Sequence, residues 1–216
     1  QAPTTPTNLR PQGVAVNWNG TQVFVACATG QVVMLEGTPT SRYSATRNIL
    51  LSGSVAPQNI AVASDQQNTT VYVTDPSGNR LFFFSPAQGT QSAEVRDIQG
   101  SPWGLAVGRN PQTGRQDRLY VTARTGNALY PLTLPDLSTA TSGGQGVSVE
   151  GKEPTYVAVS PQGNEVYVAL TGSNNIAVFK RVGQDLARPE VYQMQQLDPN
   201  FNAPTGDLGL APFLSQ

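Results

Sequence analysis

Short apolar runs separated by polar turn residues recur along the chain with a regular period. A phrase that begins with proline and ends in Ala-Val occurs four times, and its prolines are Pro11, Pro57, Pro102 and Pro154. These prolines lie 46, 45 and 52 residues apart. Runs rich in Val, Ile, Tyr and Phe that are bounded by Gly, Pro, Asn and Ser are typical of β-strands. The pattern therefore predicts four copies of one β-sheet unit.

Each unit contains four predicted strands. The proline phrase is the first, and the second carries an aromatic residue: Phe24, Tyr72, Tyr120 and Tyr167 in turn. Second strands are predicted at 23–26, 71–74, 119–122 and 166–169, third strands at 32–35, 81–84, 128–132 and 176–179, and weaker fourth strands at segments such as 48–51 and 190–194. The short connections favour antiparallel meanders, and Asn19-Gly20 predicts a type I′ hairpin turn. No segment has the apolar period of a capped helix.

Four short strands in about 45 residues is the arithmetic of a β-propeller blade. We therefore predict an all-β fold: a β-propeller built of four-stranded antiparallel blades, with at least four blades, as an incomplete part of a larger propeller. The small residues of the first strands are expected near the crowded central channel; they are Ala15, Ala61, Ala106 and Ala158. The aromatic residues of the second strands are expected between blades. A β-sandwich, the alternative fold, gives no reason for the period.

The period also sets the predicted organisation of the chain. We expect a Thr/Pro-rich N-terminal stalk at 1–8, blades at about 9–56, 57–101, 102–153 and 154–203, and the start of a fifth unit or a closing strand at 204–216. Pro204 lies 50 residues after Pro154, which favours a fifth unit and an incomplete propeller. In the alternative, a small closed ring, the segment 198–215 would pack against the first unit.

Two phrases in the repeats resemble known families. Tyr72-Val73-Thr74-Asp75 and Tyr120-Val121-Thr122-Ala123 nearly spell the YVTN signature. In the segment 75–84, an Asp and an Asn-Arg pair precede the third strand, as in NHL repeats. The chain thus resembles the YVTN and NHL repeat propellers over about residues 9–195. The resemblance implies a propeller scaffold, and YVTN repeats occur in surface-layer proteins; propellers host many unrelated activities, so it specifies function weakly.

Composition narrows the chemistry. The 216 residues include no histidine and one cysteine, and the net charge is −1. Without histidine the chain lacks the commonest general base and metal ligand, and it cannot bind haem through His. One cysteine, Cys27, allows neither an intrachain disulfide nor a cysteine zinc site, and we expect it to be a small buried apolar residue. The charge balance gives no reason to expect nucleic acid, and no apolar run approaches the ~20 residues that span a bilayer.

Candidate binding residues come from two sets of loops on one face of the predicted propeller. The blade-opening loops supply Arg10, Gln58, Trp103, Lys152, Glu153 and Tyr156, and the turns between second and third strands supply Asp75 and Arg124. Together they predict a mixed polar and aromatic pocket for a sugar, a peptide or a partner loop. Ordinary turn chemistry is the alternative explanation for each polar residue. Trp103 is the strongest candidate, because an aromatic residue at a channel mouth is a common anchor; inter-blade packing is its alternative role.

No catalytic residue, metal site or cofactor is predicted. Calcium is the one plausible metal, through oxygen ligands. The carboxylates available to it, Asp65, Asp75, Asp117 and Glu153, are isolated from one another in the sequence.

These observations lead to a first hypothesis about function. The N-terminus, Gln1 to Thr7, reads as a mature end left by cleavage of a leader. We therefore expect a non-enzymatic, secreted propeller that acts as a structural or protein-interaction module of the bacterial cell envelope. Its expected partners are other envelope proteins or further copies of itself. The alternatives are a carboxylate- and Ca²⁺-dependent lactonase-like hydrolase and a carbohydrate-binding lectin.

Overall fold

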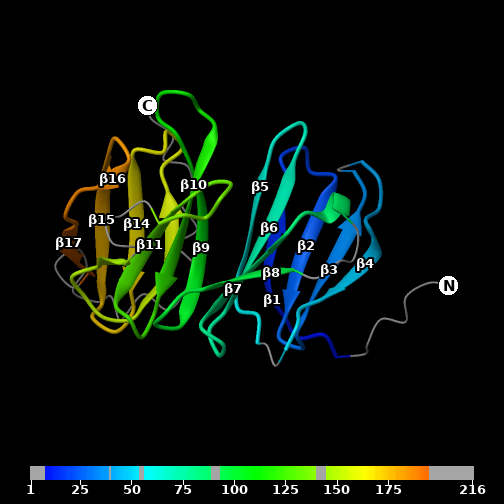
Figure 1. Ribbon diagram of the computed structural model, residues 1–216, viewed down its shortest axis with the longest axis horizontal. Coiled ribbons are helices and arrows are strands. Elements are labelled where there is room, and N and C mark those ends of the chain that lie inside the picture. The colour runs from blue at the N-terminus through cyan, green and yellow to red at the C-terminus, as the bar shows by residue number, and fades with distance from the viewer. Residues whose placement is uncertain (1–7, 39, 54–55, 89–92, 140–144, 195–216) are drawn as a thin grey trace. The chain divides into compact units, whose positions relative to one another are not determined.

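The computed structural model describes residues 8–38, 40–53, 56–88, 93–139 and 145–194, and these residues form four antiparallel sheets (Figure 1). The chain forms two compact units, Gln1–Leu105 and Ala106–Gln216. None of the helices in the described ranges has the length and apolarity needed to cross a membrane.

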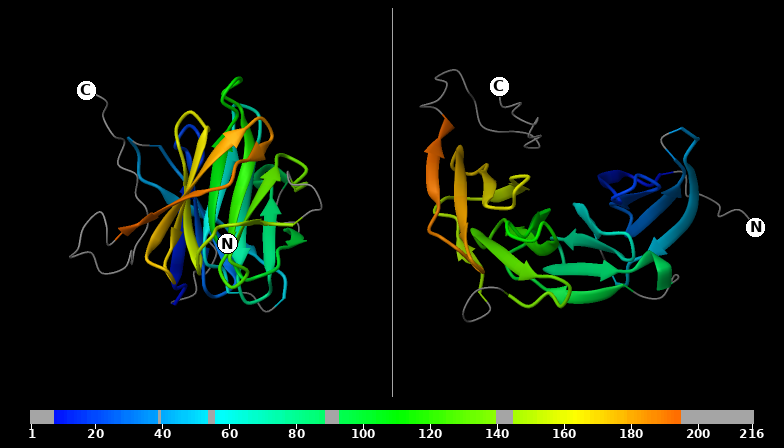
Figure 2. Two further views of the ribbon diagram at one scale, coloured as in Figure 1. Left: turned by 90° about the vertical axis from the view of Figure 1, so that its left-hand side faces the viewer. Right: turned by 90° about the horizontal axis from the view of Figure 1, so that it is seen from above.

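The first unit contains two complete sheets. Sheet 1 has the order β1-β2-β3-β4, and sheet 2 has the order β5-β6-β7-β8. Their strands are β1 (Pro11–Val16), β2 (Gln22–Cys27), β3 (Gln31–Glu36), β4 (Ser44–Leu50), β5 (Ile60–Ser64), β6 (Thr69–Asp75), β7 (Arg80–Phe84) and β8 (Glu94–Asp97), and a short 3-10 helix, η1 (Pro86–Gln88), follows β7. Strands that are neighbours in sequence are neighbours in the sheet, as the graded colour within each sheet shows (Figure 2).

The other two sheets repeat this plan. Sheet 3 has the order β12-β11-β10-β9, and sheet 4 has the order β13-β14-β15-β16, with β17 also paired to β15. Their strands are β9 (Pro102–Arg109), β10 (Gln116–Ala123), β11 (Ala128–Thr133), β12 (Val147–Ser148), β13 (Pro154–Val159), β14 (Glu165–Leu170), β15 (Asn175–Val182), β16 (Asp185–Leu186) and β17 (Glu190–Gln193). The predicted first, second and third strands of all four units are therefore confirmed. The four alanines lie on the strand that opens each sheet: β1, β5, β9 and β13.

The turn between β1 and β2 differs from the prediction. Of the pair Asn19-Gly20, Gly20 alone has a positive φ, 72°, whereas a type I′ turn needs a positive φ at both positions. The amide of Gly20 instead donates to the carbonyl of Asn17 at 3.1 Å. The turn between β13 and β14 has the same form, because Gly163 (φ 77°) donates to the carbonyl of Ser160 at 2.8 Å. Each connection is therefore longer than a two-residue hairpin turn, and a single glycine in it takes the left-handed conformation.

Each unit has an apolar core between its sheets. In the first unit, Phe24 and Met34 of sheet 1 pack in one cluster with Val71, Val73 and Phe82 of sheet 2. In the second unit the corresponding cluster contains Tyr120 and Leu129 of sheet 3 with Val166, Val168 and Phe179 of sheet 4. Within each unit, the aromatic side of the first sheet therefore packs on the valine side of the second sheet.

The aromatic residues of the second strands are buried, with one departure. Phe24, Tyr72 and Tyr120 are 0%, 1% and 1% exposed, as predicted, and burial raises the pKa of Tyr72 to about 12. Tyr167 is only half-buried. No further sheet covers it among the described residues. The predicted stalk, fifth unit and closing segment lie outside the described residues, apart from Asn8.

Candidate functional site

An asparagine recurs in the turns between second and third strands, and its side chain accepts a hydrogen bond from the start of the next blade. Asn79 and Asn127 lie in the turns between second and third strands, with φ of 52° and 48°. The side-chain oxygen of Asn79 accepts a hydrogen bond of 2.7 Å from the amide of Ser101, and that of Asn127 accepts one of 2.9 Å from the amide of Glu153. Ser101 and Glu153 each precede a blade-opening proline, and each has a positive φ. The asparagines therefore fix two strained residues at the start of the next blade.

Two threonines of the YVTN-like phrases bond to the blade-opening segments. Thr74 Oγ1 donates to the carbonyl of Trp103 at 2.8 Å, and Thr122 Oγ1 donates to the carbonyl of Thr155 at 2.9 Å. Both threonines are fully buried. Ala26 and Ala169 occupy the same position in the first and fourth units. The phrase therefore contributes to the scaffold.

Asp75, a predicted ligand-binding residue, is completely buried. One carboxylate oxygen accepts hydrogen bonds from the amide of Ala56 at 3.1 Å and from Ser77 Oγ at 2.6 Å. The other oxygen is paired with Arg80 at 2.7 Å. Burial by itself would raise the pKa of Asp75, but the hydrogen bonds from Ser77, Ala56 and Arg80 and the charge of Arg80 outweigh it and lower the pKa. Asp75 thus ties the turn after β6 to the segment that precedes β5.

The predicted polar residues of the second unit come together. Arg124 and Glu153 form an exposed ion pair, with Arg124 Nη2 2.8 Å from Glu153 Oε2. The carbonyl of Glu153 accepts hydrogen bonds from the amide and the hydroxyl of Thr171 at 3.1 and 3.0 Å. The amide of Lys152 donates to Ser173 Oγ at 3.2 Å, and its side chain is exposed. These contacts place the segment that opens sheet 4 directly against the turn between β14 and β15.

A small polar hollow adjoins this turn. It has a volume of about 220 Å³ and is lined by Ser173, Asn174, Asn175 and Gln193. With its amide oriented to suit its neighbours, Asn175 donates to the carbonyls of Asn174 and Ser173 at 2.9 and 3.1 Å. We call the surface formed by Arg124, Lys152, Glu153 and these four residues the loop face of unit 2. Amide and hydroxyl groups of this kind can bind another polar surface or a sugar.

The remaining predicted residues occupy separate places. Trp103 is half-buried in β9, and its carbonyl accepts the bond from Thr74. Arg10 is exposed with φ 49°, and its carbonyl accepts a bond of 2.9 Å from the amide of Ala28. Gln58 is half-buried, and its amide donates to the carbonyl of Thr74 at 2.9 Å. Tyr156 is half-buried in β13. These residues belong to the blade-opening segments, as the sequence predicted.

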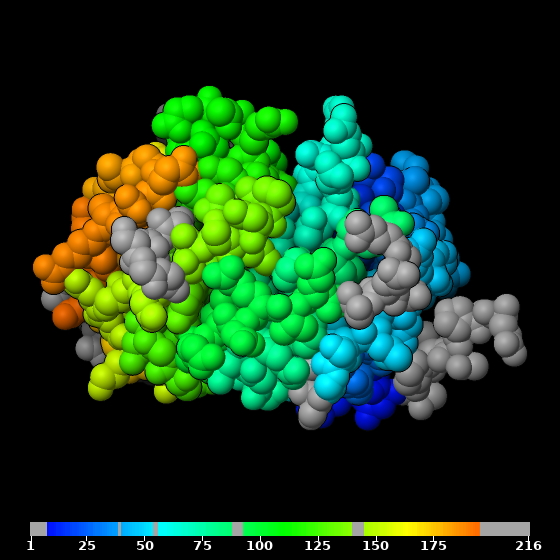
Figure 3. Space-filling view, viewed as in Figure 1, coloured from blue at the N-terminus to red at the C-terminus, as the bar shows by residue number. Residues whose placement is uncertain are grey.

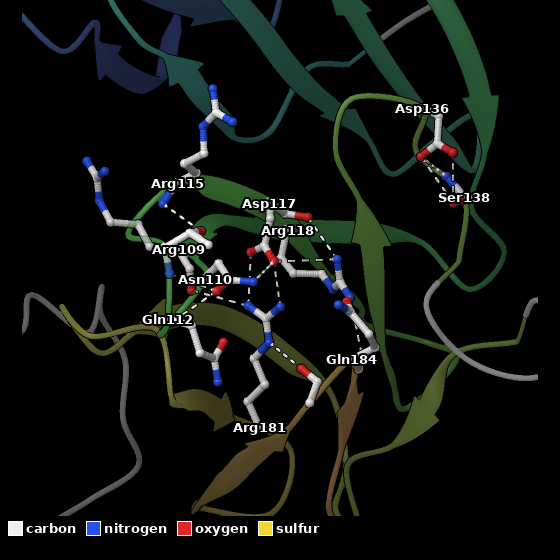
Figure 4. A network of polar contacts seen from close by, with 12 residues as sticks. Arg109, Asn110, Gln112, Arg115, Asp117, Arg118, Asp136, Ser138, Arg181 and Gln184 are labelled. Atoms are coloured by element: carbon white, nitrogen blue, oxygen red, sulfur yellow. Dashed lines mark hydrogen bonds and ion pairs between the residues drawn. The ribbon is translucent and has the colours of Figure 1, made fainter.

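Sequence reasoning missed a polar network at the other end of β10 (Figure 4). Arg181 bonds both oxygens of Asp117, at 2.9 and 2.5 Å, and Asn110 donates to one of them at 3.1 Å. Arg118 Nη1 donates to the carbonyl of Asp117 at 2.9 Å, and Arg118 Nη2 donates to the carbonyl of Gln184 at 3.3 Å and also contacts the side-chain oxygen of Gln184. The side chains of Arg118 and Arg181 are 3% and 2% exposed. The network joins sheet 3 to sheet 4.

Electrostatics within this network favour the charged form of Asp117. Burial would raise the pKa of its carboxyl group, but the hydrogen bonds from Arg181 and Asn110 and the charges of Arg181 and Arg118 lower it below the ordinary value. The partner of Asp117, Arg181, lies 64 residues away in sequence. No local pattern around either residue signals the contact.

The carboxylates considered for calcium have other partners. Asp65 Oδ1 accepts the amides of Gln67 and Asn68, both at 2.8 Å, Asp75 and Asp117 are paired with arginine, and Glu153 is paired with Arg124. Within the described ranges, no three His, Cys, Asp or Glu residues are grouped so that they could hold a metal ion. Cys27 is buried, as predicted, and burial raises the pKa of its thiol.

No protein-family model matches the chain, and no curated protein matches it. Solved structures do. Virginiamycin B lyase from Staphylococcus aureus matches with a TM-score of 0.62 at 14% identity, over 83% of this chain and 55% of that one. A putative 6-phosphogluconolactonase from Bacteroides uniformis matches with a TM-score of 0.65 at 16% sequence identity, over 85% of this chain and 55% of that one. The Swd1 β-propeller domain from Myceliophteria thermophila matches with a TM-score of 0.61 at 10% sequence identity, over 85% of this chain and 58% of that one.

The four antiparallel sheets and these likenesses define the class of protein. The chain is a β-propeller with at least four blades. It spans little more than half the length of the three propeller structures. At 10 to 16% identity the likeness shows the fold alone.

Proposed function

We propose that this protein is a non-enzymatic, exported β-propeller that acts as a structural or protein-interaction module of the bacterial cell envelope. One observation carries the proposal: two acidic side chains that are candidate binding residues are bonded to other parts of the scaffold. Asp75 is buried against Arg80 and two further donors, and Glu153 is paired with Arg124. On the loop face of unit 2, amides, hydroxyls and the exposed Lys152 are available to a partner.

The lack of histidine supports the same proposal. Virginiamycin B lyase, one of the structurally similar proteins, has also been solved as a catalytically inactive histidine-to-alanine variant with quinupristin. The 216 residues of this chain contain no histidine. A lyase of that type is therefore a poor candidate. The YVTN-like phrases support the envelope location, because YVTN repeats occur in surface-layer proteins.

A direct test compares partner capture by two charge-reversal variants. Lys152→Glu reverses a charge on the loop face of unit 2, whereas Arg115→Glu reverses an exposed charge in the turn between β9 and β10. Chemical crosslinking in an envelope extract should yield a defined product with the wild type and the Arg115 variant and at least tenfold less with the Lys152 variant. Equal crosslinking by all three proteins would contradict a partner at the loop face. Fractionation of cells that express the full gene tests the envelope location separately.

The lactonase alternative is tested by activity and calcium. A putative 6-phosphogluconolactonase is among the similar structures, and this likeness makes lactones the first substrates to assay. We expect no turnover with or without Ca²⁺, and no rise in melting temperature on adding Ca²⁺. A ligand present at 100 times its Kd would stabilise the protein by about 2.7 kcal/mol, which a melting curve detects readily. Turnover or a clear shift would overturn the non-enzymatic proposal.

Carbohydrate binding is the second candidate function, and the polar hollow favours it. Asn174, Asn175 and Gln193 line the hollow with amide groups that can bond to sugar hydroxyls. A glycan array followed by calorimetry tests this candidate. Gln193→Ala should then weaken binding, because Gln193 lies at the end of β17 and its side chain lines the hollow.

A further inference from the structure

Sheet 1 has an apolar side that is exposed along its two outer strands, β1 and β4. Side chains alternate across a strand, and in β1, β2 and β3 the residues Ala15, Phe24 and Met34 point into the core of the first unit. The residues between them point the other way. Of these, Val14 and Val16 are 65% and 50% exposed. The apolar residues of this side include the buried Val33 and Cys27. The others, which are exposed or half-buried, are Val14, Val16, Val23, Val25, Leu35 and Leu50, and we call them the Val face.

Sheet 4 has an exposed side of a different kind. Val166 and Val168 of β14 point into the core of the second unit, so Tyr167 points to the opposite side. The strand register places Ala158 and Val178 beside Tyr167, and Ile176 beside Tyr192. We call these five residues the Tyr face. Tyr192 is 44% exposed, and the segment from β15 to β17 is seen in orange on the surface (Figure 3).

The two faces are the two halves of an interface that each unit already contains. Val23 and Val25 occupy the positions of Val71 and Val73, which pack on the aromatic side of sheet 1. Tyr167 occupies the position of Tyr120, which packs on the valine side of sheet 4. The Val face therefore has the composition of a surface that an aromatic blade side covers, and the Tyr face has the composition of such a blade side.

We propose that the Val face of one copy of this chain docks on the Tyr face of a second copy. This inference goes beyond the proposed function and does not depend on export or on the loop face. The charges beside the Tyr face do not oppose the contact, because Lys180 is paired with Glu190 at 2.8 Å, and Tyr167 donates to Glu165 at 2.6 Å. A neutral Val face can cover this surface without breaking the Lys180–Glu190 pair or the hydrogen bond from Tyr167 to Glu165.

The available area fits a dimer in which the contact forms twice. Four strands of about six residues span roughly 20 Å by 19 Å, or about 400 Å² of flat sheet. A stable interface buries about 800 Å² from each partner. One contact supplies about half of this area, and two equivalent contacts supply all of it. A head-to-tail pair in which each copy offers both faces meets the requirement.

Three single variants of the whole chain test this proposal by light scattering after size exclusion. Val14→Asp puts a carboxylate on the Val face, Tyr167→Asp puts one on the Tyr face, and Val95→Asp is the control. Val95 is 44% exposed on β8, outside both faces. The wild type and the control should have about twice the monomer mass of 22.9 kDa at high micromolar concentration. Each face variant alone should have the monomer mass.

Mixing the two face variants gives the decisive result. The Val14 variant keeps an intact Tyr face, and the Tyr167 variant keeps an intact Val face, so an equal mixture should form a 1:1 dimer. A monomeric wild type at every concentration, or a face variant that still dimerises by itself, would overturn the proposal. Circular dichroism and a cooperative melt establish that each variant is folded. If Tyr167→Asp fails this check, Val178→Asp replaces it on the same face.

Discussion

Thr122 Oγ1 lies 2.9 Å from the carbonyl oxygen of Thr155 and donates a hydrogen bond to it. Thr122 is on the second strand of sheet 3, and Thr155 comes directly after the proline that opens sheet 4. Thr74 and Trp103 make the same bond in the first unit. A residue type that looks like a family signature in the sequence therefore has a definite mechanical role, because it fastens one sheet to the start of the next.

Removing this hydroxyl should destabilise the protein. Thr122→Val keeps the shape of the side chain but leaves the carbonyl of Thr155 without this donor, and we expect a loss of about 1–3 kcal/mol in the free energy of unfolding. Thr122→Ser keeps the hydroxyl and should cost less. Urea denaturation of the two variants measures the difference. A larger loss in Thr122→Ser than in Thr122→Val would show that the methyl group of Thr122, and not its hydroxyl, is the stabilising group.

The loss of stability on replacing the aromatic residues of the second strands by alanine should follow how deeply each residue is buried. Tyr72 and Tyr120 are each 1% exposed, and replacing either by alanine should cost about 3–5 kcal/mol, as for other buried aromatic residues. Tyr167 is half-buried. In a monomeric background such as Val14→Asp, Tyr167→Ala should cost clearly less than Tyr72→Ala. A loss below about 1 kcal/mol for Tyr72→Ala would mean that the position lies on the surface.

The fold could be predicted because its information is local and repeated. The alternation of Val-Tyr-Val with turn residues marks strands, and four copies of one pattern at a regular spacing mark blades. The half-buried state of Tyr167 could not be predicted in this way, because the residue looks like Tyr72 and Tyr120 in sequence. The exposure of Tyr167 depends on the surface that packs against sheet 4, and the local pattern around Tyr167 does not encode that surface.

The candidate site was predictable only in part. Lys152 and Glu153 stand beside a blade-opening proline, and their place in the loop face is a consequence of the repeat. The pairing of Asp117 with Arg181 joins residues 64 positions apart, and neither belongs to a repeated phrase. Asp75 was predictable as a turn residue, but its complete burial under Ala56, Ser77 and Arg80 was not. Long-range polar contacts of this kind depend on tertiary packing, which no spacing rule encodes.

Acid should weaken the folded state through Asp75 and Asp117. Both carboxyl groups have a pKa below the ordinary value of 3.8. A lowered pKa in the folded state stabilises the protein fully at pH values above the unfolded pKa, and this stabilisation is lost as the pH falls through the lowered pKa. We therefore expect the free energy of unfolding to decrease from about pH 5 downward, with a smaller decrease in Asp117→Asn and in Asp75→Asn.

The effect of salt should distinguish the buried carboxylates, Asp75 and Asp117, from the exposed ion pair between Lys180 and Glu190. Glu190 also has a lowered pKa, because Lys180 and Tyr192 donate hydrogen bonds to it and Lys180 carries a positive charge, but its side chain is exposed. At about 0.5 M NaCl the effect of Glu190→Gln on the acid slope should disappear, whereas that of Asp117→Asn should persist, since buried pairs are screened much less. Urea titrations between about pH 3 and pH 6 at two salt concentrations measure both slopes. Loss of both effects in salt would contradict a structural role for the buried network.

Two glycines with similar backbone conformations provide the last prediction. Gly114 and Gly163 both have positive φ, 68° and 77°, so an alanine at either position meets the same backbone strain. A Cβ atom at Gly114 would have no heavy atom within 4 Å, whereas one at Gly163 would clash directly with the carbonyl oxygen of Arg109. Gly163→Ala should therefore cost about 1–3 kcal/mol more than Gly114→Ala, because the loops must move apart as well. Urea denaturation of the two variants tests whether the turn before β14 packs directly on the end of β9. Equal losses would mean that these loops do not touch in solution.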